Sequence, residues 1–179
     1  FRRGICTRIW EGLVMAINLK SLSKPDKQRP VIMTIFGEGG LGKTTLASLF
    51  PSPVFIRTED GTASLVGNDN VSLFPVATSS QDVLDAIQAL GTEKHDHKTL
   101  VIDSITQLAS IIESEIVEQD PKAKSISTAG GGFGSGFSQA AERHSLVRSW
   151  AGSLAYEMNM NVVFIGHADT ETLTLPDMD

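Results

Sequence analysis

Cysteine is nearly absent from this chain of 179 residues, in which Cys6 stands alone. A single cysteine excludes an internal disulfide, and no Cys/His spacing is typical of a structural zinc site. No apolar run approaches the roughly 18 residues that a membrane-spanning helix requires, so we expect no membrane partner. The reducing cytoplasm is therefore the expected compartment.

Positive charge is scarce outside the N-terminus. Residues 1–30 hold seven Lys/Arg against two acids, a net charge of +5, whereas the rest of the chain holds eight Lys/Arg against nineteen acids, a net charge of −11. Such an acidic body excludes a broad basic DNA-binding face. Any contact with nucleic acid must therefore come from a local loop, from the basic N-terminus or from an assembled oligomer.

The length and composition predict one domain preceded by a lead-in. A chain of this length fits one domain, and its 41% hydrophobic and 20% charged residues are typical of a globular protein. We interpret residues 1–30 as an N-terminal extension. Residues 1–14 precede Met15, a plausible start, and are either a non-native leader or an amphipathic helix that binds a partner. Residues 31–179 form the expected domain.

Strands and helices alternate along residues 31–179, which predicts an α/β fold with a mostly parallel sheet of five or six strands and helices on both faces. We expect the first strand to be buried on both faces and the third, which contains Pro75, to lie at an edge. The predicted strands are 31–36, 53–58, 71–76, 99–103 and 161–166, and a sixth can begin at 172–175. The predicted helices are 44–50, one capped by Ser80, one starting near Ile105, and 138–158 with Val147, Trp150, Leu154 and Met158 in the core.

The strongest motif is GEGGLGKTT, which fits the phosphate-binding pattern GxxxxGK[ST]. Its glycines let backbone N–H groups wrap phosphates, Lys43 reaches the β and γ phosphates, and Thr44 binds Mg²⁺. The motif follows a predicted strand and opens a predicted helix, which is the context that it requires. We therefore expect ATP and Mg²⁺ as ligands. The expected nucleotide-binding residues are Gly37, Glu38, Gly39, Gly40, Leu41, Gly42, Lys43, Thr44 and Thr45.

Carboxylates follow two of the predicted strands. Asp103 ends the strand 99–103, the position at which P-loop enzymes hold Mg²⁺, although a strand-end Asp can also cap the next helix. Glu59 follows the second strand and should project from the same edge of the sheet, where a carboxylate can polarise the attacking water. Asp60 is the rival for this role, and a solvated turn is the alternative for both.

Together, GEGGLGKTT, VFIRTEDGT, TLVIDSITQLA, a glycine-rich loop, a long helix and VVFIGHADT resemble the RecA-type ATPase core. They are most similar to phage-encoded RecA-like ATP-binding proteins of single-strand annealing and recombination, over roughly Val31 to Thr170. The resemblance implies a catalytic glutamate at Glu59 and a metal-serving aspartate at Asp103. It also places the last strand between the P-loop strand and the Asp103 strand, so that His167 takes the γ-phosphate-sensing position where RecA has a glutamine.

The glycine-rich segment 127–137 occupies the place of the first DNA-binding loop of RecA-like proteins. Phe133 and Phe137 can stack on bases, which contributes about 1–3 kcal/mol each, and Lys122 and Lys124 lie just upstream. The loop itself has no Lys or Arg, so a flexible connection or a hinge that closes over the nucleotide is the alternative.

The resemblance further implies a DNA-stimulated ATPase that acts on single-stranded DNA in recombination, annealing or repair, in the bacterial host cytoplasm if phage-encoded. Implied partners are a second copy in a ring or filament, and a single-strand-binding or other recombination protein. The family's core continues into a second DNA-binding loop, and residues that complete a neighbour's site are expected beyond Asp179.

The sequence also bears on alternative functions and on further candidate residues. A GTPase is disfavoured because the chain has no NKxD segment to read guanine. A kinase with a basic lid is disfavoured because only three arginines follow residue 30. A nucleotide-gated scaffold with little turnover and no direct DNA binding remains the alternative function. His95, Asp96 and His97 either form a metal clip or lie in a solvated loop. Arg143 and Arg148 either reach a neighbour's phosphate or lie on a solvated helix face.

Overall fold

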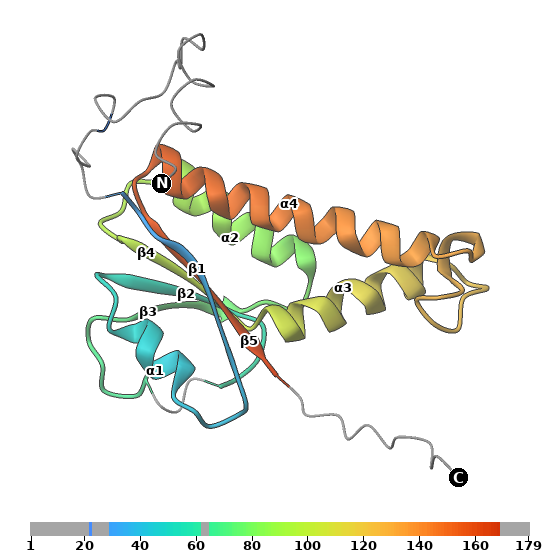
Figure 1. Cartoon of the computed structure of the whole chain (residues 1–179), viewed down its shortest axis with the longest axis horizontal. Helices are drawn as coiled ribbons and strands as arrows, with labels where there is room; N and C mark the ends of the chain where they lie inside the picture. The colour runs from blue at the N-terminus through green and yellow to red at the C-terminus, as the bar shows by residue number, and fades with distance from the viewer. Residues whose placement is uncertain (1–21, 23–28, 62–64, 169–179) are drawn as a thin grey trace, which may run out of the picture.

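A computed structural model describes residues 22, 29–61 and 65–168. The chain forms three layers, with a parallel sheet between α1 on one face and α2, α3 and α4 on the other (Figure 1). This arrangement confirms the predicted α/β fold with helices on both faces. The expected sixth strand at 172–175 and nearly all of the lead-in 1–30 lie outside the described residues.

The five strands pair in the order β1-β5-β4-β2-β3, and every pairing is parallel. As predicted, the strand before His167 lies between the P-loop strand and the Asp103 strand. Parallel pairing brings the carboxyl ends of all five strands to one edge of the sheet, which positions the candidate site. The strands are β1 Ile32–Gly37, β2 Pro53–Arg57, β3 Ser72–Val76, β4 Thr99–Asp103 and β5 Asn161–His167.

The position of β1 differs from the prediction. Its residues alternate between exposed and half-buried, and among the described strands it pairs with β5 alone. The prediction that this strand is buried on both faces was wrong. An apolar run indicates that a strand forms, but it does not show whether that strand lies in the middle of the sheet or at its edge. The expectation for residues 71–76 is confirmed, since β3 with its Pro75 is the other edge strand.

The helices form close to the predicted positions, with small differences at their ends. Ser79, rather than Ser80, caps α2 by accepting a hydrogen bond from the Asp82 N–H. The last helix begins at Ser135, three residues before the predicted start, and places Met158 after its end, where this side chain is 41% exposed and outside the core. The helices are α1 Lys43–Ser48, α2 Ser80–Thr92, α3 Ile105–Gln119 and α4 Ser135–Glu157.

The two sides of the sheet bury cores of different size. The α2–α4 side holds the larger cluster, in which Leu108, Ile112 and Ile116 of α3 pack as their spacing predicts and Trp150 is half-buried. The α1 side holds a smaller cluster around Phe55. Within the described residues, no helix combines the length and apolar character needed to cross a membrane.

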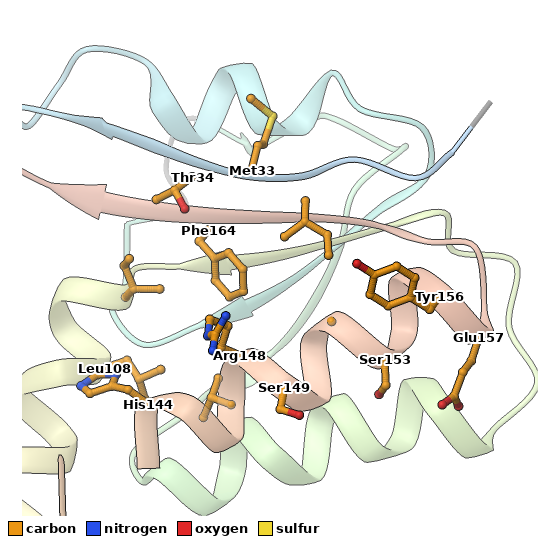
Figure 2. A pocket seen from close by; sticks show the side chains of 14 residues that line it. Met33, Thr34, Leu108, His144, Arg148, Ser149, Ser153, Tyr156, Glu157 and Phe164 are labelled. Atoms are coloured by element: carbon orange, nitrogen blue, oxygen red, sulfur yellow. The ribbon is translucent and has the colours of Figure 1, made fainter. Parts of the chain in front are cut away.

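A groove of about 770 Å³ lies between β1 and α4, away from the P-loop. Met33 and Thr34 of β1 line one side, and Ser153 and Tyr156 of α4 line the other (Figure 2). His144 lies at one end of this groove. The groove exists because β1 is an edge strand, so α4 covers only part of its face.

Candidate nucleotide and catalytic site

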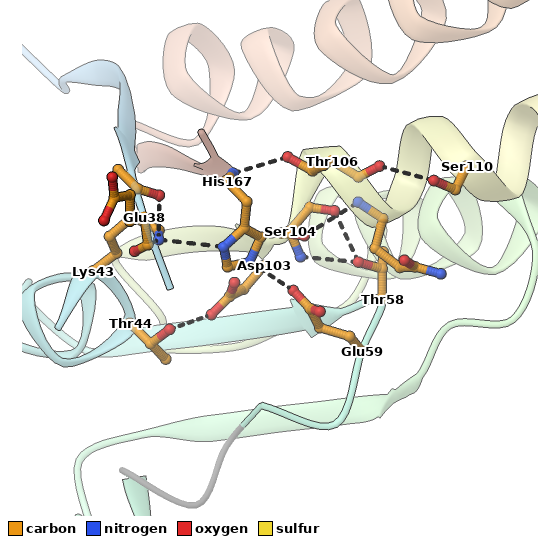
Figure 3. Close-up of polar contacts among 12 residues, drawn as sticks. Glu38, Lys43, Thr44, Thr58, Glu59, Asp103, Ser104, Thr106, Ser110 and His167 are labelled. Atoms are coloured by element: carbon orange, nitrogen blue, oxygen red, sulfur yellow. Dashed lines mark hydrogen bonds and ion pairs between the residues drawn. The ribbon is translucent and has the colours of Figure 1, made fainter. Parts of the chain in front are cut away.

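The carboxyl ends of β1, β5, β4 and β2 meet at one edge of the sheet (Figure 3). Gly37 at the end of β1 is in register with His167 of β5. Asp103 of β4 is in register with Arg57 of β2, two residues before Glu59. Residues that are more than 100 positions apart in the sequence therefore become neighbours through strand order alone.

The P-loop 37–45 forms an open turn between β1 and α1. Gly40 and Gly42 have φ of 77° and 79°, a left-handed conformation that glycine adopts without a steric cost. A Cβ at Gly39, Gly40 or Gly42 would meet no atom within 4 Å other than those of its chain neighbours, so these three glycines border open space. This loop can bring its backbone close to an anionic group.

Lys43 is buried at the first turn of α1, and its ammonium group points back into the loop. Its Nζ donates hydrogen bonds to the carbonyl oxygens of Gly37 at 2.7 Å and Glu38 at 2.8 Å. It also lies 3.3 Å from Nδ1 of His167. An ammonium group has three protons and no acceptor, so Nδ1 must be the acceptor in this contact.

The next residue, Thr44, meets Asp103 directly. The Thr44 hydroxyl donates to Oδ2 of Asp103 at 2.6 Å. Asp103 is buried, and this burial raises the pKa of its carboxyl; the Thr44 hydrogen bond acts against the rise and the charge of Glu59 adds to it. Ser104 rather than Asp103 caps α3, by accepting from the Gln107 N–H, so helix capping is excluded as the role of Asp103.

Glu59 is joined to the same site by a hydrogen bond with His167. Its Oε1 lies 2.9 Å from Nε2 of His167. Because Lys43 occupies Nδ1 as a donor, the neutral ring carries its proton on Nε2 and donates it to Glu59. The rival carboxylate, Asp60, is 87% exposed and lies 3.7 Å from Arg57 instead.

Thr58, Ser104 and Thr106 stabilise this site through hydrogen bonds, and none of them belongs to a motif that indicated the site. The Thr58 hydroxyl donates to the Ser104 carbonyl and accepts from the Ser104 N–H, and the Thr58 N–H donates to the Asp103 carbonyl. The N–H of His167 donates to the Thr106 hydroxyl at 2.8 Å. The sequence signal for Ser104 was the capping pattern Ser-x-x-Gln, whereas no local pattern indicates Thr58 or Thr106.

The proposed DNA residues lie far from the P-loop. Segment 127–137 joins the end of α3 to the start of α4, and α3 starts beside Asp103 and runs outward for 15 residues, about 22 Å (Figure 1). The segment therefore does not lie over the P-loop in this structure, which disfavours the alternative of a hinge that closes over the nucleotide. The sequence placed Phe137 in the loop, but it belongs to the first turn of α4.

The remaining polar candidates do not join the site. His95 Nε2 bonds to the Leu90 carbonyl, and the pair His95 and His97 is not among the clusters with metal-ligand geometry in the described part of the chain. Arg143 is half-buried and donates to Glu115 at 2.6 Å and to Gln119 at 2.9 Å, so it pairs with α3 rather than lying on a fully solvated helix face. Arg148 is exposed and lines the β1–α4 groove.

The residues present fit a nucleotide with Mg²⁺. The P-loop glycines border open space, and the Lys43 ammonium group lies against the carbonyls of the loop, from where it can reach a phosphate. Thr44 and Asp103 bring a hydroxyl and a buried carboxylate together, which is the oxygen-rich donor set that Mg²⁺ prefers. Burial raises the pKa of the Asp103 carboxyl although Lys43 and His167 act against the rise, and a divalent cation in contact with the carboxylate would favour its charged form further.

Comparison with known proteins agrees with this geometry at the level of the family. No curated protein matches the sequence. The family model of the AAA domain, a P-loop NTPase core with nucleotide-binding and hydrolysing members, matches residues 29–179. This span includes the P-loop, the strand that ends at Asp103, and His167. The chain belongs to the AAA domain family.

Proposed function

We propose that this protein is a Mg²⁺-dependent ATPase that acts on single-stranded DNA in recombination, annealing or repair. The observation that carries the ATPase part is the meeting of Thr44 and Asp103 at 2.6 Å, with Glu59 held in the same cluster through His167. Asp103, His167 and Glu59 lie at or just after three separate strand ends and Thr44 lies on α1, so their convergence is a property of the fold. The DNA part rests on the resemblance to RecA-like proteins and on exposed residues of the α3–α4 tip, by which we mean residues 120–137, the connection between the two helices and the first residues of α4.

Each residue has a distinct role in the proposed reaction. Lys43 exchanges its contact with His167 for the terminal phosphates and neutralises charge there. Glu59 orients the attacking water and accepts its proton, for which the carboxylate has a second oxygen besides the Oε1 that contacts Nε2 of His167. Thr44 and Asp103 would hold Mg²⁺, which when bound neutralises charge on the β and γ phosphates. His167 contacts both Lys43 and Glu59, so it is placed to sense whether a γ-phosphate is present.

The α3–α4 tip supports direct contact with DNA. Phe133 is fully exposed, and its φ of 53° is a left-handed conformation that is rare outside glycine, Asn and Asp. Phe137 is 52% exposed, and Lys122 and Lys124 are both exposed nearby. An exposed aromatic ring held in a strained conformation is typical of a functional position, and stacking on bases would use it.

One observation favours the second candidate, a nucleotide-gated scaffold with little turnover. The Glu59 carboxylate is already paired with His167, and a hydrogen bond to the carboxylate lowers its tendency to accept a proton from water. Nucleotide binding would then change the α3–α4 tip or an oligomer contact without rapid hydrolysis. Assembly into a ring or filament belongs to both candidate functions.

Steady-state ATP hydrolysis with and without single-stranded DNA tests the proposal. We expect DNA to raise turnover in the wild-type protein and Lys43→Ala to abolish it. Phe133→Ala should lose the stimulation but keep basal turnover. Tyr156→Ala is the matched control, because Tyr156 is an exposed aromatic at the other end of α4, 85% accessible to solvent.

The outcomes separate the two candidates. ATP binding without turnover, in the presence or absence of DNA, would favour the scaffold. Turnover that DNA does not change would contradict the DNA part and leave the ATPase part standing. Equal loss of stimulation in Phe133→Ala and Tyr156→Ala would show that the tip is not the DNA contact.

A further inference from the structure

The catalytic edge of the sheet holds a set of ligands that the ATPase proposal does not explain. Glu59, Asp103 and His167 each offer one ligand atom, and these atoms lie within 4.8 Å of one another. The set contains an imidazole nitrogen beside two carboxylates. Mg²⁺ is bound through oxygen ligands, so a Mg²⁺ site does not account for the nitrogen. A nitrogen ligand is characteristic of sites for transition-metal ions.

The backbone and side chains around this cluster fix it in place. The Asp103 carbonyl accepts the Thr58 N–H at 2.9 Å, which joins the end of β4 to the residue that precedes Glu59. The His167 N–H is held by the Thr106 hydroxyl on α3. The ligands thus stand on strand ends that are tied together by hydrogen bonds, so a cation would meet them with little rearrangement.

The charges in the cluster favour a cation. Two carboxylates lie together, and Asp103 is 8% exposed, so its charge is poorly solvated. Lys43, the nearest ammonium group, directs two of its protons to backbone carbonyl oxygens and the third to His167. Because the protons of Lys43 are directed elsewhere, a divalent ion between the carboxylates would add positive charge in direct contact with them.

We propose that, in the absence of nucleotide, Glu59, Asp103 and His167 together bind one divalent transition-metal ion of the class of Mn²⁺, Co²⁺ and Zn²⁺. Two carboxylate oxygens and one imidazole nitrogen match the donors that this class accepts, and three protein ligands leave positions open for water or phosphate oxygen. The site shares Asp103 with the proposed Mg²⁺ position, but it does not depend on ATP.

Binding at Nε2 changes the contacts of His167. The proton on Nε2 leaves for solvent and Nδ1 takes one from solvent, so the charge of the ring does not change. Nδ1 then becomes a donor and can no longer accept from Lys43. Lys43 is thereby released from His167 toward the mouth of the P-loop, so the bound ion prepares the lysine for phosphate.

The test is titration of the nucleotide-free protein with Mn²⁺. Binding is measured from the electron paramagnetic resonance signal of the Mn²⁺ that remains free. We expect one Mn²⁺ per chain, with an affinity at least 10-fold weaker in His167→Gln, because glutamine offers no imidazole nitrogen. The matched control is His97→Gln, whose ring belongs to the His95–His97 pair outside the site and which should bind as the wild type does. Mg²⁺ at equal concentration should not displace Mn²⁺.

Several results would overturn the site. These are no binding by the wild-type protein, equal affinity in His167→Gln, weaker binding in His97→Gln, or displacement by equimolar Mg²⁺. Thermal transitions of both variants establish that they are folded before titration. ATP binding is measured separately, so a protein that binds ATP but no Mn²⁺ refutes this site without refuting the proposed function.

Discussion

Glu59 and Asp60 are adjacent carboxylates with different surroundings. Glu59 meets His167 at 2.9 Å, whereas Asp60 lies at the surface beside Arg57. We predict that Glu59→Gln lowers kcat by about 10²–10⁴-fold with nucleotide affinity retained, because only proton transfer is removed. Single-turnover hydrolysis and equilibrium binding of a fluorescent ATP analogue measure the two effects. Asp60→Asn is the control and should leave kcat unchanged; a loss in Asp60→Asn alone would reverse the assignment.

Two glycines of α4 differ in the space around them. A Cβ on Gly136 would collide with the Ile126 carbonyl oxygen, which belongs to the backbone and cannot move cheaply, whereas a Cβ on Gly152 would meet nothing within 4 Å. We predict that Gly136→Ala destabilises the protein by about 1–3 kcal/mol. Gly152→Ala should stabilise it by up to about 1 kcal/mol, because alanine favours the helix. Urea unfolding measures both, and changes of the same sign would contradict this packing.

At the scale of helices and strands, local patterns predicted most of the elements. The run at residues 99–103 and the apolar spacing of Leu108, Ile112 and Ile116 gave the strand and helix that flank Asp103. Helix ends were less predictable. Ser79 and Ser80 are both good caps, and only the hydrogen bond from the Asp82 N–H distinguishes them. Met158 has core spacing but follows the last helical residue, so the helical periodicity no longer applies to it.

The pH dependence of stability can be predicted for α4. Burial lowers the pKa of His144 below its usual value of 6.5, although Glu113 on α3 acts against the shift. Above pH 6.5 the ring is neutral in both states and costs nothing. As the pH falls below 6.5, the unfolded chain takes up the proton before the folded protein does, so folding stability is lost down to the folded-state pKa.

The measurement is the difference in Tm between the wild type and His144→Gln at pH 7.5 and pH 5.5. We expect the wild type to lose more stability on acidification than the variant, because glutamine does not titrate. Other titrating groups contribute to both proteins and cancel in the difference. If the variant loses as much stability on acidification as the wild type does, His144 does not contribute to the pH dependence of stability.

At the scale of the whole molecule, the sequence predicted the layers but not the full arrangement. The order of β1, β5 and β4 followed from a resemblance rather than from local composition, and the edge position of β1 was missed. The site illustrates the same limit. Lys43, Thr44, Glu59, Asp103 and His167 each had a sequence signal, but their hydrogen bonds depend on strand register. Thr58 and Thr106 had none, since their partners are distant in the sequence.

Nucleotide binding should stabilise the whole fold, because the site joins the ends of several strands. A ligand at 100 times its Kd adds about 2.7 kcal/mol to the free energy of unfolding. For a chain of this size we therefore predict a rise in Tm of roughly 5–10 °C with ATP and Mg²⁺. Differential scanning fluorimetry measures the shift. Lys43→Ala should show none, and an equal rise in that variant would place the nucleotide elsewhere.

The α3–α4 hairpin connects the two ends of the molecule mechanically. α3 starts two residues after Asp103, and the segment that carries Phe133 follows its far end (Figure 1). With an arm of about 22 Å, a tilt of about 10° at the base carries the far end through about 4 Å. Any rotation of the hairpin at its base is thus enlarged toward its far end, where about 4 Å is comparable to the separation of stacked bases.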